Sequence, residues 1–112
     1  MVCIEKEVDD IMVITLKGKL ISHEETSQLH NCIKAVLERD LIKIILNLKN
    51  LSRISSLGIG AIMRAMTIVR DTGGDLRLAG LDSNVKAIFQ ITKLIGVIQI
   101  FDQNDQAISS FA

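Results

Sequence analysis

The sequence predicts an α/β fold in which a mixed, mostly parallel β-sheet is packed against helices. Segments typical of strands alternate with segments of helical periodicity in the order ββαβαβαβα, an alternation that is typical of parallel sheets. The strand expected at 42–48, IKIILNL, is apolar at most positions, as is usual for a strand buried on both faces. With 112 residues, 48% of them hydrophobic, the chain should form a single domain, 1–112, around one core.

The N-terminal third predicts a β-hairpin and then a helix. Residues 2–8 and 11–17 are the expected strands, and the two aspartates between them form a polar turn of hairpin length. Ser22 and Glu25 form an S-x-x-E capping box, in which each side chain satisfies a backbone N–H at a helix start. The apolar residues that follow have helical spacing and are Leu29, Cys32, Ile33, Val36 and Leu37. This helix should end near Arg39.

The C-terminal half predicts two further strands and three helices. An apolar helical stripe runs from Ile59 to Val69 and should end at Gly73-Gly74, because glycine favours helix C-termini. The next strand is expected at 75–81 and the last one at 97–101, VIQIF. A helix between them carries Val85, Ile88, Phe89 and Thr92 on one face. A short helix from Asp105 should point Ala107, Ile108 and Phe111 inward.

Composition excludes several classes of function. Thirteen basic and thirteen acidic residues cancel without forming a long block, and the three aromatic residues are phenylalanines in apolar contexts. Neither a nucleic-acid-binding face nor a basic membrane-surface helix is therefore expected. No apolar run approaches the ~20 residues that cross a bilayer, and the N-terminus does not resemble a signal peptide. Cys3 and Cys32 lack metal-like or redox-like spacing, so a reducing cytoplasm is the expected location.

The segment 52–62, SRISSLGIGAI, lies where a site is expected, between the end of a strand and the start of a helix. A nucleophile elbow, G-x-S-x-G, would need glycine where Ile54 stands. A catalytic triad would also need a histidine and an acid beside the serine, and of the two histidines only His23 could lie in a neighbouring loop. No metal-ligating pattern is present either. We therefore expect no catalytic residues, no metal and no cofactor.

The glycines of this segment also fit no nucleotide-binding motif. Gly58-Ile59-Gly60 begins like a dinucleotide fingerprint, but Met63 stands at the third glycine, and no Walker A lysine is present. Small residues here would let the helix start approach the sheet closely, with Ser55 or Ser56 as N-cap. A serine hydroxyl at a helix start is also where a phosphate would be tolerated, because free N–H groups and the helix dipole favour an anion.

The chain resembles STAS domains of the anti-sigma factor antagonist type along essentially its whole length. The landmarks are VITLKGKL, IILNLKNLSRISSLGIGAI, TGGDLRLAGL and VKAIFQITKLIGVIQIFDQNDQAISSF, in the family's order. If Gly58-Ile59-Gly60 matches the family's Gly-Leu-Gly, the phosphorylated serine falls on Ser56, with Ser55 as the fallback acceptor. The family's Asp before this serine is then Ser55, and its following Ser or Thr is Leu57. A further family Asp, after the second strand, is Ile21 here.

This resemblance implies a protein-binding switch without enzymatic activity. The unphosphorylated domain would bind an anti-sigma factor that is also a serine kinase of the GHKL type. Phosphorylation would weaken the complex, and a serine phosphatase of the PP2C type would reset it. The partner-binding residues expected on this basis are Ser55, Ser56, Leu57, Gly58 and Ile59. The alternative is a STAS scaffold or adaptor that takes no phosphate, such as a stressosome-like or transporter-associated module.

Overall fold

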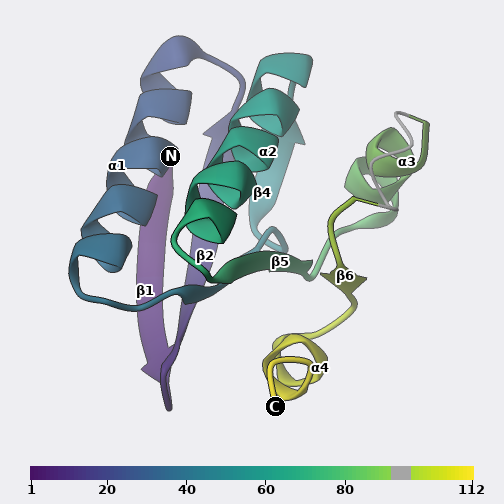
Figure 1. The fold of residues 1–112 in the computed structure, drawn as a ribbon. Helices are drawn as coiled ribbons and strands as arrows, with labels where there is room; N and C mark the ends of the chain where they lie inside the picture. Colours follow the sequence, from purple (N-terminus) through teal and green to yellow (C-terminus); the bar gives the residue numbers. More distant parts are fainter. Residues whose placement is uncertain (92–96) are drawn as a thin grey trace.

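The computed structural model describes residues 1–91 and 97–112, in which one six-stranded sheet packs against helices on both faces (Figure 1). The strands are β1 (Val2–Val8), β2 (Ile11–Leu20), β3 (Lys43–Asn47), β4 (Leu51–Ile54), β5 (Asp75–Ala79) and β6 (Ile100–Phe101). The helices of the described part are α1 (His23–Glu38), α2 (Ser56–Asp71), α3 (Ser83–Ile91) and α4 (Asn104–Ser109). The predicted α/β class with a mostly parallel sheet is confirmed. None of these helices is long and apolar enough to cross a membrane.

The sheet has the strand order β1-β2-β3-β5-β6, and β4 pairs with β2 beside this path. The predicted N-terminal hairpin is confirmed: β1 runs antiparallel to β2, with Val2 opposite Lys17 and Val8 opposite Ile11. All other pairs are parallel. Because β2 is ten residues long, its first half pairs with β3 and its end pairs with β4. The ends of β2 and β4 therefore lie side by side, and both lead into helices.

Strand β4 is a correction, because the sequence indicated no strand between the one expected at 42–48 and the helix that begins after Ser55 or Ser56. Only Leu51 of its four residues is buried, so the segment shows neither the alternation nor the apolar run that indicates a strand. Pairing with the end of β2 makes it a strand, at a register shift between Gly18 and Lys19. The Ser52 hydroxyl reinforces this pairing by donating to the carbonyl oxygen of Gly18 at 2.9 Å.

The last strand is also shorter than predicted. The sequence indicated 97–101, whereas β6 contains only Ile100 and Phe101, which pair with Leu78 and Ala79. Ile98 is buried in the core without being part of the strand. Thr92, which was expected on the inward face of α3, lies outside the described residues. Val85 and Phe89 of the same helix are buried, as predicted.

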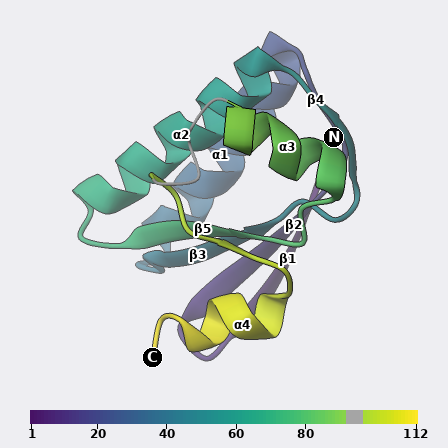
Figure 2. The same ribbon diagram turned by 90° about the vertical axis from the view of Figure 1, so that its right-hand side faces the viewer.

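Helices cover the two faces of the sheet unequally, as Figure 2 shows, with α1, α2 and α3 on one face and α4 on the other. The main core lies under α1 to α3 and includes Leu16, Leu29, Ile33, Ile62 and Phe89, all buried. A smaller cluster under α4 contains Ile11, Val13, Ile45, Ala79 and Ala107. Ile108 and Phe111 pack against this cluster, so the prediction that the C-terminal segment points them inward is confirmed.

Candidate functional site

Two serines with different surroundings begin helix α2. Ser55 is the N-cap: its backbone is extended, with φ −104°, and its hydroxyl oxygen accepts a hydrogen bond from the Gly58 N–H at 3.3 Å. The same hydroxyl donates to the carbonyl oxygen of Ile21 at 3.2 Å. The Ser55 N–H in turn donates to the carbonyl oxygen of Leu20 at 3.1 Å. Ser55 thus fastens the start of α2 to the end of β2 and to the turn that follows it.

Ser56 is the first residue of α2, and its side chain is exposed. Across residues 1–91 and 97–112, no group forms a hydrogen bond with its hydroxyl. The first turn of α2 contains no acidic residue, so nothing in that turn repels an anion placed there. Ser56 is therefore the serine whose hydroxyl is accessible to another protein, while the hydroxyl of Ser55 is engaged in holding the helix start.

Gly58 and Gly60 play different parts in the same motif. A Cβ on Gly58 would lie 2.2 Å from the carbonyl oxygen of Leu20 and 2.9 Å from Cγ1 of Ile54. Glycine is therefore required at this position for α2 to approach β2 so closely. A Cβ on Gly60 would meet nothing within 4 Å. Gly60 is exposed instead, and the absence of a side chain there leaves open space beside Ser56.

The neighbouring β2–α1 turn is held by the predicted capping box. The Glu25 carboxylate accepts hydrogen bonds from the N–H groups of Ile21, at 2.9 Å, and Ser22, at 3.1 Å. The Glu25 N–H donates to the Ser22 hydroxyl oxygen at 3.4 Å, which completes the box. The hydrogen bond from the Ile21 N–H is the main cause that lowers the pKa of Glu25. The ionised carboxylate thus fixes the turn whose carbonyl receives the Ser55 hydroxyl.

A shallow groove of about 480 Å³ runs between α1 and α2, next to Ser56. Its α1 wall consists of His23, Thr26, Ser27 and His30, and its α2 wall consists of Ser56, Leu57, Gly60, Ala61 and Arg64. His30 Nε2 lies 3.2 Å from the carbonyl oxygen of Ala61, a contact that joins the two helices. Sequence reasoning missed the groove because its walls are 26 or more residues apart. The feature of the sequence that could have indicated the groove is Gly60, which lies one helical turn after Ser56 and has no side chain to fill the space beside it.

The structure narrows the surface that the sequence analysis expected to bind a partner. Gly58 is buried, and Ile59 is only 6% exposed and belongs to the main core. These two residues are therefore not available for contact, because their positions face the sheet rather than solvent. Leu57 is 38% exposed and lines the groove, and Ile21 in the adjacent turn is 36% exposed. Leu57 is thus an exposed apolar side chain directly after Ser56, and Ile21 lies in the turn whose carbonyl oxygen accepts from the Ser55 hydroxyl.

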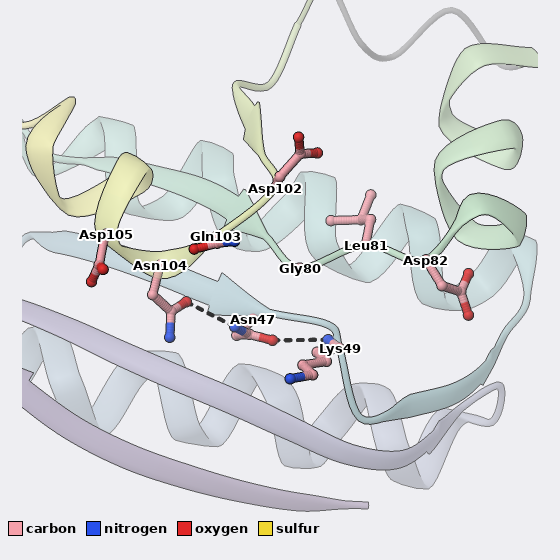
Figure 3. Close-up of a pocket in the computed structure, with 9 residues that line it drawn as sticks. All are labelled: Asn47, Lys49, Gly80, Leu81, Asp82, Asp102, Gln103, Asn104 and Asp105. Carbon is pink, nitrogen blue, oxygen red and sulfur yellow. Dashed lines mark hydrogen bonds between the residues drawn. The ribbon is translucent and has the colours of Figure 1, made fainter.

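A second hollow, of about 680 Å³, lies at the carboxyl ends of β3 and β5 (Figure 3). The buried Asn47 side chain donates from Nδ2 to Oδ1 of Asn104 at 2.8 Å and accepts from the Lys49 N–H at 2.8 Å. A Cβ on Gly80 would lie 2.8 Å from Asn47 Oδ1. The hydrogen bond to Asn104 anchors the start of α4 to the end of β3. In the sequence, this hollow was indicated by a single asparagine, Asn47, at the end of an otherwise apolar strand.

Comparison with known proteins assigns this fold to one family. The model of the STAS domain family matches residues 4–107. A curated relative, the anti-sigma F factor antagonist of Paenibacillus polymyxa, is 23% identical over 99 residues, which cover 88% of this chain and 85% of the relative.

Two solved structures have the same fold. An anti-sigma factor antagonist from Mycobacterium paratuberculosis superposes with a TM-score of 0.84 at 15% identity, over 97% of this chain and 92% of that one. The phosphorylated form of the Bacillus cell fate determinant SpoIIAA gives 0.74 at 21% identity, over 99% and 100% of the two chains. With a family model that spans most of its length and a sheet and helices arranged as in these proteins, the chain belongs to the STAS domain family.

Proposed function

We propose that this protein is an anti-sigma factor antagonist that works as a phosphorylation-controlled binding switch. In its unphosphorylated form it binds an anti-sigma factor that is also a serine kinase of the GHKL type, and it is released when Ser56 is phosphorylated. The observation that carries this proposal is the exposed Ser56 hydroxyl at the first position of α2, beside the groove between α1 and α2. The curated relative, an anti-sigma F factor antagonist, supports the choice of partner.

The local electrostatics favour a phosphate at this position. A phosphoserine carries about −1.5 to −2 charges at neutral pH, and helix N-termini favour anions by ~0.3–1 kcal/mol. No carboxylate lies in the first turn of α2. The phosphorylated protein should therefore keep its fold, so that the modification acts on the complex and not on the domain itself. The structure of phosphorylated SpoIIAA shows that a protein of this fold exists in such a form.

The surface that the partner would cover is apolar next to the acceptor. Leu57, next to Ser56, and Ile21, in the turn that the Ser55 hydroxyl contacts, each expose about a third of their surface, and Gly60 leaves room for a partner side chain. Docking on this surface would bury the Ser56 hydroxyl. A phosphate in the same place would have to be desolvated against apolar side chains, which costs several kcal/mol unless it is paired. Binding in one state and release in the other follow from this difference.

The acceptor can be tested by incubating the chain with its kinase and ATP and mapping the phosphate by mass spectrometry. We expect one phosphate, located on Ser56, and none on the variant Ser56→Ala. The matched variant Ser55→Ala should still accept the phosphate, although loss of the N-cap should cost ~1 kcal/mol of stability. A phosphate on Ser55, or on Ser56→Ala, would refute the assignment.

Leu57→Ser tests the apolar contact beside the acceptor. Because Leu57 is 38% exposed and lies outside the core, its loss should leave the melting temperature unchanged. Affinity for the anti-sigma factor should fall by roughly 5–30-fold, the equivalent of ~1–2 kcal/mol for an interface contact of ordinary size. Ile68→Ser is the matched control, since Ile68 is also on α2 and 38% exposed but is not part of the groove. A lower melting temperature with unchanged affinity would instead make Leu57 a structural residue.

The adaptor alternative predicts a different outcome of the same experiments. A scaffold of this fold would bind its partner equally well with and without phosphate, or would accept none. A serine phosphatase of the PP2C type would then have no substrate here. Under our proposal such a phosphatase removes the phosphate from Ser56, restores binding and completes the cycle in the cytoplasm.

A further inference from the structure

Helix α4 covers only one end of its face of the sheet, the end next to the turn between β1 and β2 (Figure 2). Val8, at the end of β1, packs against the buried cluster beneath α4. Because side chains alternate along a strand, Lys6, Ile4 and Val2 point to this same face. Val2 and Ile4 are 56% and 50% exposed, the two highest values for large apolar side chains in the described part of the chain. This end of the face is therefore open to solvent.

The neighbouring strands β2 and β4 add three cations to the open end. Leu16 and Leu20 of β2 are buried in the main core, on the other side of the sheet. Lys17 and Lys19, which stand next to them in the strand, therefore point to the α4 face. Arg53 of β4 is paired with Lys19 and points the same way. We call the residues of this open end the basic face: Val2, Ile4, Lys6, Lys17, Lys19 and Arg53.

The charges of these three strands are sorted by face. Their carboxylates, Glu5 and Glu7, point to the opposite side, where Arg39 of α1 lies 3.6 and 3.2 Å from them. Across residues 1–91 and 97–112, no cation of the basic face forms an ion pair or hydrogen bond through its side chain. Lys19 and Arg53 stand side by side, although like charges on paired strands destabilise a sheet. A chain with balanced charge thus has one surface that is only positive.

The side chains of the basic face match a membrane surface that carries anionic lipids. Clusters of lysine and arginine are attracted to acidic headgroups, and each cation close to the surface raises the affinity about fivefold. Val2 and Ile4, which are exposed beside these cations, supply aliphatic side chains that can enter the interface. Such a contact needs no shape complementarity, so the surface of a sheet is sufficient.

A protein or a nucleic acid fits this face less well. Lysine is depleted in protein–protein interfaces, which are anchored by aromatic residues and arginine in pockets. The basic face has more lysine than arginine and no aromatic residue, and neither hollow described above includes any of its residues. A nucleic acid would set its phosphates against Val2 and Ile4, and no aromatic side chain of this face could stack on a base.

We propose that the basic face docks this protein reversibly on membranes that carry anionic lipid headgroups. Helices α1 and α2 lie on the opposite side of the sheet, so the docked protein has Ser56 and its groove turned away from the lipid (Figure 2). The attraction comes from a small number of exposed cations, so docking is weak and salt-dependent.

Sedimentation of the full chain with lipid vesicles tests this contact. One set of vesicles contains phosphatidylcholine alone, and the other contains phosphatidylserine and phosphatidylcholine in equal parts. We expect the chain to sediment with the anionic vesicles at low ionic strength and to leave them when salt is added. With the neutral vesicles it should stay in solution.

Lys19→Glu reverses one charge of the basic face without harm to the fold. The new carboxylate would stand opposite Arg53, and opposite charges on paired strands stabilise a sheet, so the melting temperature should not fall. Affinity for the anionic vesicles should drop roughly 25-fold, about fivefold for each of the two units of charge. Lys34→Glu is the matched control and should bind like wild type, since Lys34 is also exposed but lies on α1, on the other side of the sheet.

The proposal is wrong if the chain sediments with neither set of vesicles, or equally with both. Equal binding by Lys19→Glu and wild type would also refute it, because the contact would then lie on another face. If the vesicles are not bound and Lys19→Glu instead weakens binding of the anti-sigma factor, the basic face is a protein-binding surface and the membrane has no part in it.

Discussion

Gly58→Ala should unfold at a much lower temperature than the wild-type protein. The added methyl group would lie 2.2 Å from the backbone oxygen of Leu20, which cannot turn aside as a flexible side chain could. Helix α2 would have to move away from β2, and the Ser55 contacts to Leu20 and Ile21 would be lost with it. We expect a loss of about 3 kcal/mol or more, the upper part of the range for overpacked sites. This corresponds to a fall of roughly 10–20 °C in melting temperature.

Gly60→Ala is the control that separates this steric effect from a general cost of losing glycine. A Cβ on Gly60 meets no atom within 4 Å, and alanine is favoured over glycine inside helices by ~1 kcal/mol. Gly60→Ala should therefore be neutral or slightly stabilising in thermal unfolding followed by circular dichroism. Equal losses in the two variants would contradict the close approach of α2 to β2 at Gly58.

Ser56→Glu should fold normally and bind the anti-sigma factor poorly. A carboxylate at the first position of α2 is neutral or stabilising, by ~0.3–1 kcal/mol, because of the helix dipole. In the complex the same charge would lie next to the exposed apolar side chain of Leu57, so binding should weaken at least tenfold, or ~1.4 kcal/mol. Calorimetric titration measures the affinity, and thermal unfolding confirms the fold.

Thr67→Glu is the matched control for this charge. Thr67 is exposed on the same helix but does not line the groove between α1 and α2. A glutamate there changes the net charge by the same amount and should leave the affinity as it is. If Ser56→Glu and wild type bind with equal affinity, the interface lies elsewhere on the molecule.

Features set by local chemistry could be predicted from the sequence. The hairpin follows from its polar two-residue turn, and the start of α1 follows from the Ser22–Glu25 box, whose hydrogen bonds form as expected. The C-terminal segment also packs as its apolar positions indicated. For the hairpin and the helix start, the determining interactions join residues close together in the chain, and for the C-terminal segment the spacing of the apolar residues alone indicates which face is buried.

Features that depend on distant pairing could not be predicted in the same way. Strand β4 exists because the end of β2 reaches past β3, and nothing in its four residues indicates this. The sequence presents Gly58 and Gly60 alike, and only the close packing of Gly58 against Leu20 and Ile54 distinguishes them. Ile59 was expected at the partner surface, but the rotation of α2 turns it into the core.

Under the proposed function, the unphosphorylated protein displaces a sigma factor from its anti-sigma factor, and phosphorylation of Ser56 abolishes this. The most direct measurement titrates each form into the preformed complex of sigma factor and anti-sigma factor, without ATP, and follows the sigma factor released. We predict stoichiometric release by the unphosphorylated chain and by Ser56→Ala, and no release at the same concentrations by the phosphorylated chain. Equal release by both forms, or none by either, would contradict the account.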